Sequence, residues 1–442
     1  MKIGLLDHMG YGNLGDAATQ EALIENMRRR MPGVEIVGFS LNPEDTKRRH
    51  GIRSYSITQW HPGLAKSTDT GTSDIGEMRS FKSILKQIPI FSTIVKRLLY
   101  LYREFAHLIR SFKVLRSLDS LVIAGGGQLS ELWRGPWSHP YNVLKFSVLT
   151  KAARRKLIVL NVGAGPLDSG LAKAFVKWSV TLADYVSFRD IVSQTLVQRL
   201  GVKRDTHVFP DSAYALDLSC CEASTPGPVL RPTVGINPIG FCDPRIWPKQ
   251  DEAAYSRYLG KLVTIVQWLI KHNYRVRVYS GEASVDLYAL EDLKTRLMSS
   301  VSLNDDDIVF LPPANSVQAL LAEMTSLDFV ITSKFHGVIF SHLLAKPVIA
   351  ISYHQKISDL MKIVGHDQYC VPIENFTSKR VEEIFTSLVS ESQSLKSTFR
   401  ETARSYSARL TEQFDYLFIS EGLQQSHNAV RADDGSVLTR PI

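Results

Sequence analysis

Short β-branched and aromatic runs alternate with longer segments of helical spacing along most of the chain. Phe329–Thr332 is one such run, as expected of a buried strand in a parallel sheet. A small loop follows, then an apolar segment that reaches Lys346 and is stopped by Pro347, and then the apolar run Val348–Ser352. This pattern predicts a β-loop-α-β unit. Its repetition along the chain predicts an α/β fold.

The alternation starts twice, which indicates two domains. We expect an N-terminal Rossmann-like domain over residues 1–218 and a C-terminal Rossmann-like domain with terminal helices over residues 233–418. Residues 219–232 contain three prolines without clear periodicity and are predicted to be the linker, and residues 419–442 form a polar tail. A chain of 442 residues with 44% hydrophobic content can bury a core in each domain.

Two stretches of the first half depart from the alternation. Asn42–Ser80 is polar and is predicted to be an irregular loop or insertion. Arg79–Arg116 carries nine basic residues against one acid, Glu104, with apolar residues at mostly helical spacing and a break at Pro89. Such a basic amphipathic segment, about residues 79–117, can make peripheral contact with an anionic membrane. It can equally be an ordinary helix with a solvated basic face.

Composition narrows the partners without naming them. The net charge of +8 favours anionic partners. Nucleic acid is not expected, because the basic residues concentrate in one segment without interleaved stacking aromatics. The four cysteines (Cys220, Cys221, Cys242 and Cys370) show neither metal spacing nor a disulfide framework, which favours a reducing compartment. No signal-peptide pattern and no run of spanning length is recognised, so we expect a cytoplasmic protein, at the inner face of the membrane if the basic segment binds lipid.

The loop after Phe329–Thr332 carries the first candidate chemistry. If it is extended, Lys334 and His336 share one face and Phe335 turns to the core. A cation beside a titratable imidazole at a helix N-terminus suits a phosphorylated or carboxylated substrate. A surface lysine and a core-edge histidine are the alternative.

The first strand leads into a glycine turn with the spacing G-x-G-x-x-G. The turn residues that we single out are Gly12, Asn13, Gly15 and Asp16. Asp16 is predicted to cap the helix Ala17–Met31. The spacing also occurs in dinucleotide-binding folds, but a lone fingerprint is weak, and a simple strand-to-helix turn remains open.

Two further strand ends carry candidate groups. "VIAGGGQL" ends a strand in glycines and is followed by aromatic residues that suit stacking on a sugar ring. The candidate acceptor residues there are Gly126, Gly127, Gln128, Trp133 and Trp137. Arg189 ends the strand of "YVSFRD", where it can bind an anion or pair with Asp190. Asp211 is interpreted as a turn cap.

Four motifs in this order resemble the polysaccharide pyruvyl transferase family. They are "GYGNLGDAA", "VIAGGGQL", "SFRD…FPDSAYAL" and "TSKFHGVIFSHLLAKPVIAISYHQK", and the resemblance covers roughly Met1–Ser390. One position departs from the family pattern, because its usual arginine is Lys334 here. A bidentate fork is thereby replaced by a point charge.

The resemblance implies two Rossmann-like domains that face a cleft in a glycosyltransferase-B-like arrangement. It also implies transfer of the pyruvate moiety of phosphoenolpyruvate to a saccharide or lipid-linked saccharide as a ketal, in exopolysaccharide or other polysaccharide biosynthesis. His336 would be the general acid or base with a pKa near neutrality. Lys334, Arg189, Lys356 and the backbone at Gly337 would bind the donor. We expect no metal and no cofactor beyond phosphoenolpyruvate as co-substrate.

Two other function classes stay open. The same cleft would suit a glycosyltransferase that uses a nucleotide sugar. The chain could also be a non-catalytic glycan- or membrane-binding relative, which the replacement at Lys334 makes conceivable.

Overall fold

The apolar runs of the first half form a parallel sheet. A computed structural model of the chain describes residues 1–7, 12–59, 89–132, 135–221, 231–282, 285–300 and 306–420, without the side chains of 89–96, 220, 300 and 420. In these residues the first sheet has seven strands in the order β3-β2-β1-β4-β5-β6-β7. They are β1 (Lys2–Leu6), β2 (Glu35–Ser40), β3 (Arg53–Ser56), β4 (Ser120–Ala124), β5 (Lys156–Val162), β6 (Tyr185–Phe188) and β7 (His207–Val208).

The second half repeats the design. Its six described strands pair in parallel in the order β10-β9-β8-β11-β12-β13. They are β8 (Thr233–Asn237), β9 (Arg275–Val278), β10 (Ile308–Phe310), β11 (Phe329–Thr332), β12 (Val348–Ser352) and β13 (Cys370–Pro372). In each sheet the strand order reverses beside its first strand, as in doubly wound nucleotide-binding folds. The predicted pair of Rossmann-like domains is therefore confirmed.

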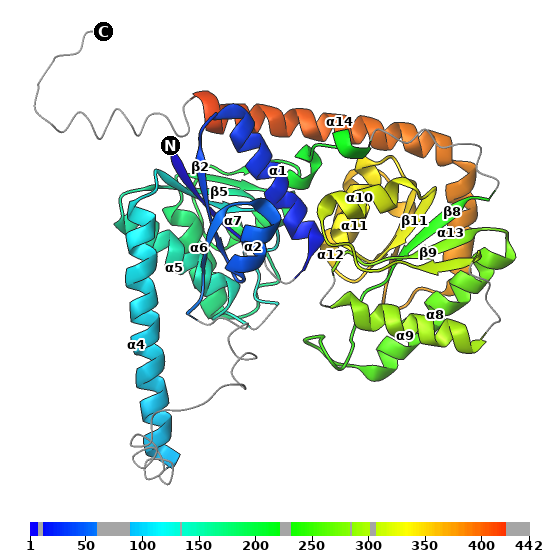
Figure 1. Cartoon of the computed structure of the whole chain (residues 1–442), viewed down its shortest axis with the longest axis horizontal. Coiled ribbons are helices and arrows are strands. Elements are labelled where there is room, and N and C mark those ends of the chain that lie inside the picture. Colours follow the sequence, from blue (N-terminus) through cyan, green and yellow to red (C-terminus); the bar gives the residue numbers. More distant parts are fainter. Residues whose placement is uncertain are drawn as a thin grey trace, which may run out of the picture.

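Helices cover both sheets (Figure 1). The first domain contains α1 (Leu14–Arg30), α2 (Pro43–His50), α4 (Pro89–Arg116), α5 (His139–Ala152), α6 (Gly170–Leu182), α7 (Ile191–Arg199) and the short helices η2 (Ser212–Ala215) and η3 (Ser219–Cys221). The second contains α8 (Glu252–Lys271), α9 (Asp286–Ser300), α10 (Val317–Thr325), α11 (Phe335–Leu343), α12 (Gln355–Ile363), η4 (Asp367–Tyr369) and α13 (Ser378–Ser390), followed by α14 (Ser392–Asp415) and η5 (Tyr416–Ser420).

The polar stretch after Asn42 is ordered where the structure describes it, so the prediction of an irregular loop is wrong for α2 and β3. Asn42 caps α2 by accepting a hydrogen bond from the Asp45 N–H (3.3 Å), Pro43 opens the helix, and Gly51 ends it with a φ of 63°. These are ordinary helix signals. The hydrophobic pattern did not predict this helix because α2 has no apolar stripe. Residues 60–80 lie outside the described part.

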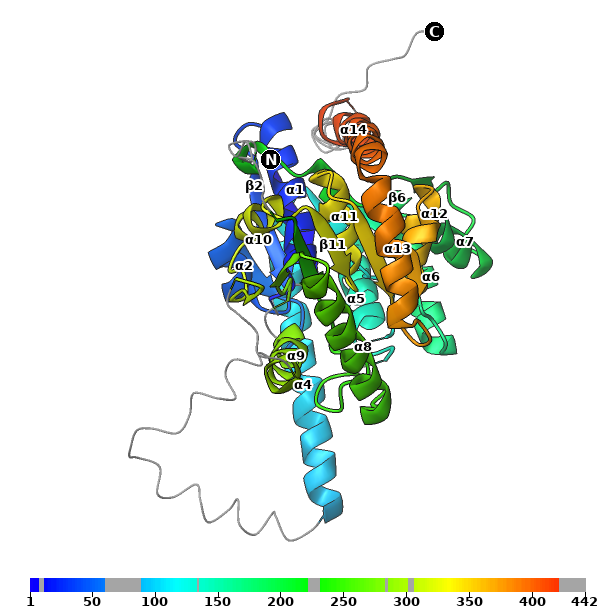
Figure 2. The ribbon, with the colours of Figure 1, turned by 90° about the vertical axis from the view of Figure 1, so that its right-hand side faces the viewer.

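Pro89 is the first residue of α4. Residues 79–88 of the predicted basic segment lie outside the described residues. Figures 1 and 2 show α4 extending well beyond the first sheet. None of the described helices, α4 included, is both long and apolar enough to cross a bilayer.

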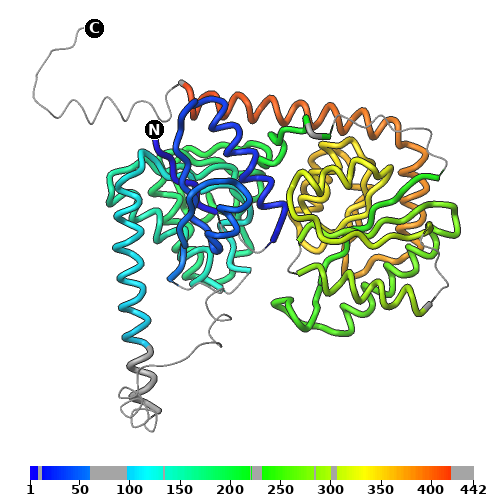
Figure 3. Tube along the Cα trace, viewed as in Figure 1, coloured from blue at the N-terminus to red at the C-terminus, as the bar shows by residue number. Residues whose placement is uncertain are grey.

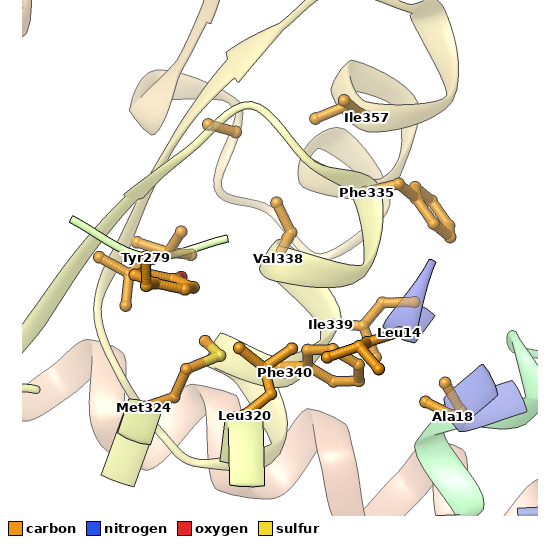
Figure 4. Packing of buried hydrophobic residues seen from close by; sticks show 14 of the residues in the cluster. Leu14, Ala18, Tyr279, Leu320, Met324, Phe335, Val338, Ile339, Phe340 and Ile357 are labelled. Atoms are coloured by element: carbon orange, nitrogen blue, oxygen red, sulfur yellow. The ribbon is translucent and has the colours of Figure 1, made fainter. Parts of the chain in front are cut away.

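The two domains share an apolar contact where α1 meets α11. Leu14 and Ala18 of α1 lie beside Ile339 and Phe340 of α11 (Figure 4), and all four belong to one buried cluster. The Leu14 N–H also donates to the Gly281 carbonyl (2.9 Å) across the interface. The cleft is therefore closed on one side by packed side chains.

The last helix joins both domains, although the sequence assigned it to the second. Its first half packs Phe399 against His342 of α11, with ring centroids 4.6 Å apart. Its second half runs along the first domain (Figure 3), where Gln413 is buried against Asn161 and Arg30 pairs with Asp415 at 2.6 Å. The helices α13 and α14 meet at Glu391.

His342 provides a test of this interface through pH. Its Nδ1 lies 2.8 Å from the Tyr214 hydroxyl, and burial together with nearby His366 lowers its pKa to about 3. Below about pH 6.5 the imidazole of His342 is protonated in the unfolded chain but stays neutral in the folded chain. The free energy of unfolding therefore decreases as pH falls. We expect His342→Gln to destabilise the protein at pH 7. The difference in the free energy of unfolding between the variant and the unchanged protein should shrink by about 1.4 kcal/mol per pH unit from about pH 6 to about pH 4, measured by urea unfolding. A deficit that is independent of pH would contradict a neutral, buried His342.

Candidate active site

A cavity of about 1400 Å³ lies between the two domains. Its lining includes Asp7, which follows β1, Gly127 and Gln128, which follow β4, Asn237 at the end of β8, and Lys334, which follows β11. These strands are the central pairs at which each sheet reverses its order. The cavity therefore occupies the position where open α/β sheets bind ligands.

The structure brings most of the predicted site residues to this one cavity. Those that line it are Asn13, Gly15, Asp16, Gly127, Gln128, Trp137, Arg189, Lys334, His336, Gly337 and Lys356. Gly12 and Gly126 belong to the same two turns, with φ values of 81° and 57° that suit glycine. Trp133 lies outside the described residues. Residues from four separate motifs thus converge on one site.

The N-terminal turn places α1 against the predicted catalytic histidine. Asn13, and not Asp16 as predicted, caps α1, since its Oδ1 accepts from the N–H groups of Gly15 (2.9 Å) and Asp16 (3.4 Å). A Cβ added to Gly15 would lie 2.1 Å from the Nδ1 atom of His336. Glycine is therefore required at position 15 for the imidazole to sit where it does.

His336 lies in the first turn of α11, because the helix already begins at Phe335. Its Nε2 atom is 3.5 Å from the Thr19 hydroxyl and 3.9 Å from Asp211 Oδ1. Burial, with smaller effects of Arg189 and the nearby lysines, lowers the pKa of His336 to about 4 against the opposing effect of Asp211. The imidazole is thus neutral at pH 7, whereas the sequence led us to expect a pKa near neutrality.

Asp211 does more than cap a turn. Its Oδ1 accepts from the Ala213 N–H (3.0 Å) and from the Thr19 hydroxyl (3.4 Å), and its Oδ2 accepts from Arg189 (3.1 Å). Burial opposes ionisation, but His336, Arg189 and the hydrogen bond from Ala213 hold the pKa of Asp211 below its usual range. A carboxylate fixed in this way orients the groups around His336.

Two cations from different domains meet over the ring of Phe335. The guanidinium of Arg189 lies 4.3 Å from the ring centroid and the ammonium of Lys356 lies 5.7 Å from it. The His336 ring is edge-on to the same ring, with centroids 5.3 Å apart. Asp211 and Asp190 both pair with Arg189, at 3.1 Å and 3.7 Å, whereas no ion pair of Lys356 occurs among the described residues. Lys356 therefore brings to this corner a positive charge that no described carboxylate pairs with.

The loop is not extended beyond Lys334, so the condition for a shared face with His336 is not met, although both residues line the cavity. Lys334 precedes the helix in an extended conformation, and its Nζ atom lies 2.7 Å from Glu282 Oε2 and 2.8 Å from Asp286 Oδ1. Burial opposes its charge, but these two carboxylates raise the pKa of Lys334 well above its usual range. Lys334 lines the cavity with a charge that two acids already balance, unlike Lys356.

The carboxyl group of Asp16 also lines the cavity, next to the glycine turn that follows β4. A Cβ on Gly126 would lie 3.4 Å from Asp16 Oδ1, so the turn after β4 passes close to this group. Burial and the neighbouring carboxylate of Glu282 raise the pKa of Asp16 well above its usual range. The cavity therefore holds a neutral imidazole and a carboxyl group that retains a proton more readily than usual.

A second wall of the cavity combines aromatic rings with a buried ion pair. Trp137 lies 5.4 Å from Tyr141 and 5.5 Å from Phe175 between ring centroids. Glu104 of α4 accepts from the Tyr141 hydroxyl (2.9 Å) and from Lys145 (3.1 Å). Gln128 donates to Asp7 at the base of this wall. The predicted acceptor side thus presents rings and hydrogen-bonding groups together, as saccharide binding requires.

The sequence missed the acids that shape the site. Glu282 and Asp286 follow β9 and pair with a lysine more than forty positions away, so no local pattern announces them. Asp7 carried a usable signal, because it directly follows the first apolar strand. Among the described residues no three histidine, cysteine or acidic side chains gather as a metal site would require.

Comparisons with known proteins agree with this arrangement. The model of the polysaccharide pyruvyl transferase family matches residues 13–355. A search of curated proteins finds no match.

Solved structures resemble the fold at low sequence identity. The UDP-GlcNAc 2-epimerase of Neisseria meningitidis shares 9% identity and a TM-score of 0.56, over 93% of this chain and 98% of that one. The enzyme of the same name from Methanocaldococcus jannaschii shares 11% and 0.54, over 87% and 92%. Spinosyn rhamnosyltransferase SpnG shares 10% and 0.50, over 94% and 100%. The fold is therefore that of glycosyltransferase-B-type proteins, as predicted.

Proposed function

The chain belongs to the polysaccharide pyruvyl transferase family, and from this membership we propose that it moves the pyruvate moiety of phosphoenolpyruvate onto a sugar as a ketal. The family assigns the chain to enzymes that modify polysaccharides. The donor, the acceptor and the steps are the proposal. The observation that carries it is the pair of cations, Arg189 and Lys356, over Phe335 beside the neutral imidazole of His336.

This pair suits the charges of the donor. Phosphoenolpyruvate has a carboxylate and a phosphate ester on the same carbon, so its binding requires cations that approach from more than one side. Arg189 comes from the end of β6 and Lys356 from the start of α12, on opposite domains. The fork of Arg189 suits bidentate contact, whereas Lys356 offers a point charge. Donor binding would thus bridge the domains.

The proposed reaction forms two C–O bonds and breaks one. A sugar hydroxyl adds to C2 of the donor, and a proton adds to C3, which becomes the methyl group. The C2–O bond to phosphate then breaks, and a second hydroxyl of the sugar adds to C2 to close the ketal. One hydroxyl proton is thereby balanced by the proton on C3, and the other leaves with inorganic phosphate.

Two titratable groups of the cavity, His336 and Asp16, suit complementary roles in this reaction. A neutral His336 can accept the proton of the attacking hydroxyl, because its pKa lies below neutrality before the donor binds. Asp16, whose pKa burial raises, is our candidate for the proton delivered to C3. Asp211 and Thr19 act as positioning residues for His336. A site can serve as both acid and base when the pKa values of two groups differ, because one group then carries a proton while the other can accept one.

A direct assay tests the reaction class. Purified protein is incubated with phosphoenolpyruvate and a panel of hexosides, and phosphate release is measured together with the product mass. We expect a gain of about 70 Da per sugar, the increment for pyruvate minus water. Thermal-shift measurements with UDP-sugars run in parallel, since only a true ligand stabilises the native state. Stabilisation by a UDP-sugar alone, without phosphate release, would replace the proposal by a glycosyltransferase.

Lys356→Met should weaken donor binding with a smaller effect on folding. Loss of a charged contact to phosphate or carboxylate costs about 1.5–3 kcal/mol, so we expect the Kd of phosphoenolpyruvate to rise about 10- to 100-fold by calorimetry. Lys362→Met, an exposed lysine of the same helix, is the matched control. Equal donor affinity in the two variants would remove Lys356 from the donor site.

A further inference from the structure

The outer face of α4 carries an apolar stripe that the rest of the described protein does not cover. Its members recur at helical spacing on one side of the helix, and their exposed fractions run from 41% for Ile109 to 71% for Tyr102. We define this outer stripe as Leu98, Leu101, Tyr102, Phe105 and Ile109. Contiguous exposed apolar residues of this size mark an interaction site.

The opposite side of the same helix belongs to the protein. His107, Ser111 and Leu115 are buried, and Glu104 is paired with Lys145. Tyr100 and Glu104 line the cavity. The outer stripe therefore points away from the body, while the inner face of the helix forms part of the wall of the candidate active site.

The charges of α4 distinguish between a second copy of the chain and a lipid surface as the partner of the outer stripe. The described side chains of α4 include five basic residues and one acid, and that acid, Glu104, faces inward. The basic residues are Arg97, Arg103, Arg110, Lys113 and Arg116. A second copy of this helix would bring like charges together, whereas anionic headgroups would be attracted by about 1 kcal/mol per basic residue. Long basic side chains can also reach headgroups while apolar neighbours enter the acyl boundary.

We propose that the outer stripe and basic residues of α4 bind the surface of an anionic lipid bilayer. The helix extends away from the first domain in both views (Figures 1 and 2), and the exposed side chains of the stripe lie on the side opposite its buried residues. Because Tyr100 and Glu104 line the cavity on the inner face, binding would hold the candidate active site next to that surface. This deepens the proposed function by favouring a lipid-linked saccharide as acceptor.

Vesicle sedimentation of the full chain tests the surface without donor or acceptor, so its failure is separate from a failure of the transfer reaction. The vesicles are phosphatidylcholine alone, or phosphatidylcholine with about 30 mol% phosphatidylglycerol. We expect binding to the anionic vesicles only, and a decline as salt rises from about 0.1 to about 0.5 M. Leu101→Glu with Phe105→Glu should reduce the partition coefficient more than about tenfold.

Matched variants control for charge and exposure. Met298→Glu with Ile363→Glu changes two exposed apolar residues of the second domain and should bind as the unchanged protein does. Arg103→Ser with Arg110→Ser should weaken binding about 30-fold, and Arg257→Ser with Arg400→Ser much less. Circular dichroism checks that each variant is folded. Full binding by the α4 variants, or a dimer by light scattering that only the Leu101 and Phe105 variant dissociates, would overturn the proposal.

Discussion

Replacing His336 with Gln should lower the rate of phosphate release from phosphoenolpyruvate by about 10²- to 10⁴-fold, the range that general acid–base groups contribute. Glutamine keeps the polar contact with Thr19 but cannot take up a proton at pH 7. Donor affinity should change little, because in the proposed donor site the charged contacts come from Arg189 and Lys356 and the imidazole is neutral. The measurement is kcat with a saturating acceptor, together with the donor Kd by calorimetry.

His342→Gln is the control for this substitution. It lies on the same helix, is fully buried against Tyr214 and does not line the cavity. It should reduce stability and leave kcat nearly unchanged. A His336 variant with an unaltered rate would refute the assignment, and equal losses in both variants would assign them to disturbance of α11.

Gly15→Ala should cause a loss of similar size by displacing the same imidazole. The added methyl would lie 2.1 Å from the Nδ1 atom and 2.4 Å from the Cγ atom of His336, whereas real contacts require more than 3 Å. The ring must therefore move by about 1 Å, and a displacement of that size can cost about 100-fold in rate. The ring movement can be followed separately from turnover by the chemical shifts of the His336 imidazole.

Gly260→Ala is the matched glycine substitution. Gly260 lies within α8, and a Cβ there meets nothing within 4 Å. Alanine should be neutral or slightly stabilising at this position and leave the rate unchanged. A Gly15 variant that retains full activity would show that the His336 position required by the proposal is not the reactive one.

The sequence predicted the fold well because the apolar runs are unambiguous. Strands such as Phe329–Thr332 and Val348–Ser352 are buried along their whole length, so burial and sequence pattern coincide. The helix α2 shows where this reasoning fails. Its eight residues lack an apolar face, and it is defined by Asn42, Pro43 and Gly51 at its ends. The bounds of α2 can therefore be predicted only from its capping residues and not from hydrophobic periodicity.

The site was predicted in its members more than in its geometry. Motifs placed Gly15, Arg189, His336 and Lys356 at strand and helix ends, and the fold brings them to one cavity. The partner of Lys334 could not be predicted, since Glu282 and Asp286 approach it only through the pairing of β9, β8 and β11. The lowering of the His336 pKa depends on burial of the imidazole against α1. No local sequence pattern predicts that contact.

The return of α14 to the first domain bears on how the chain matures during synthesis. Asn161 and Ser187 are fully buried, and both bond to Gln413, more than two hundred residues later. On the ribosome the nascent first domain emerges without the Gln413 amide, so Asn161 and Ser187 keep only their bonds to each other and to Ser212. We expect that domain to stay loosely packed until translation delivers the final helix.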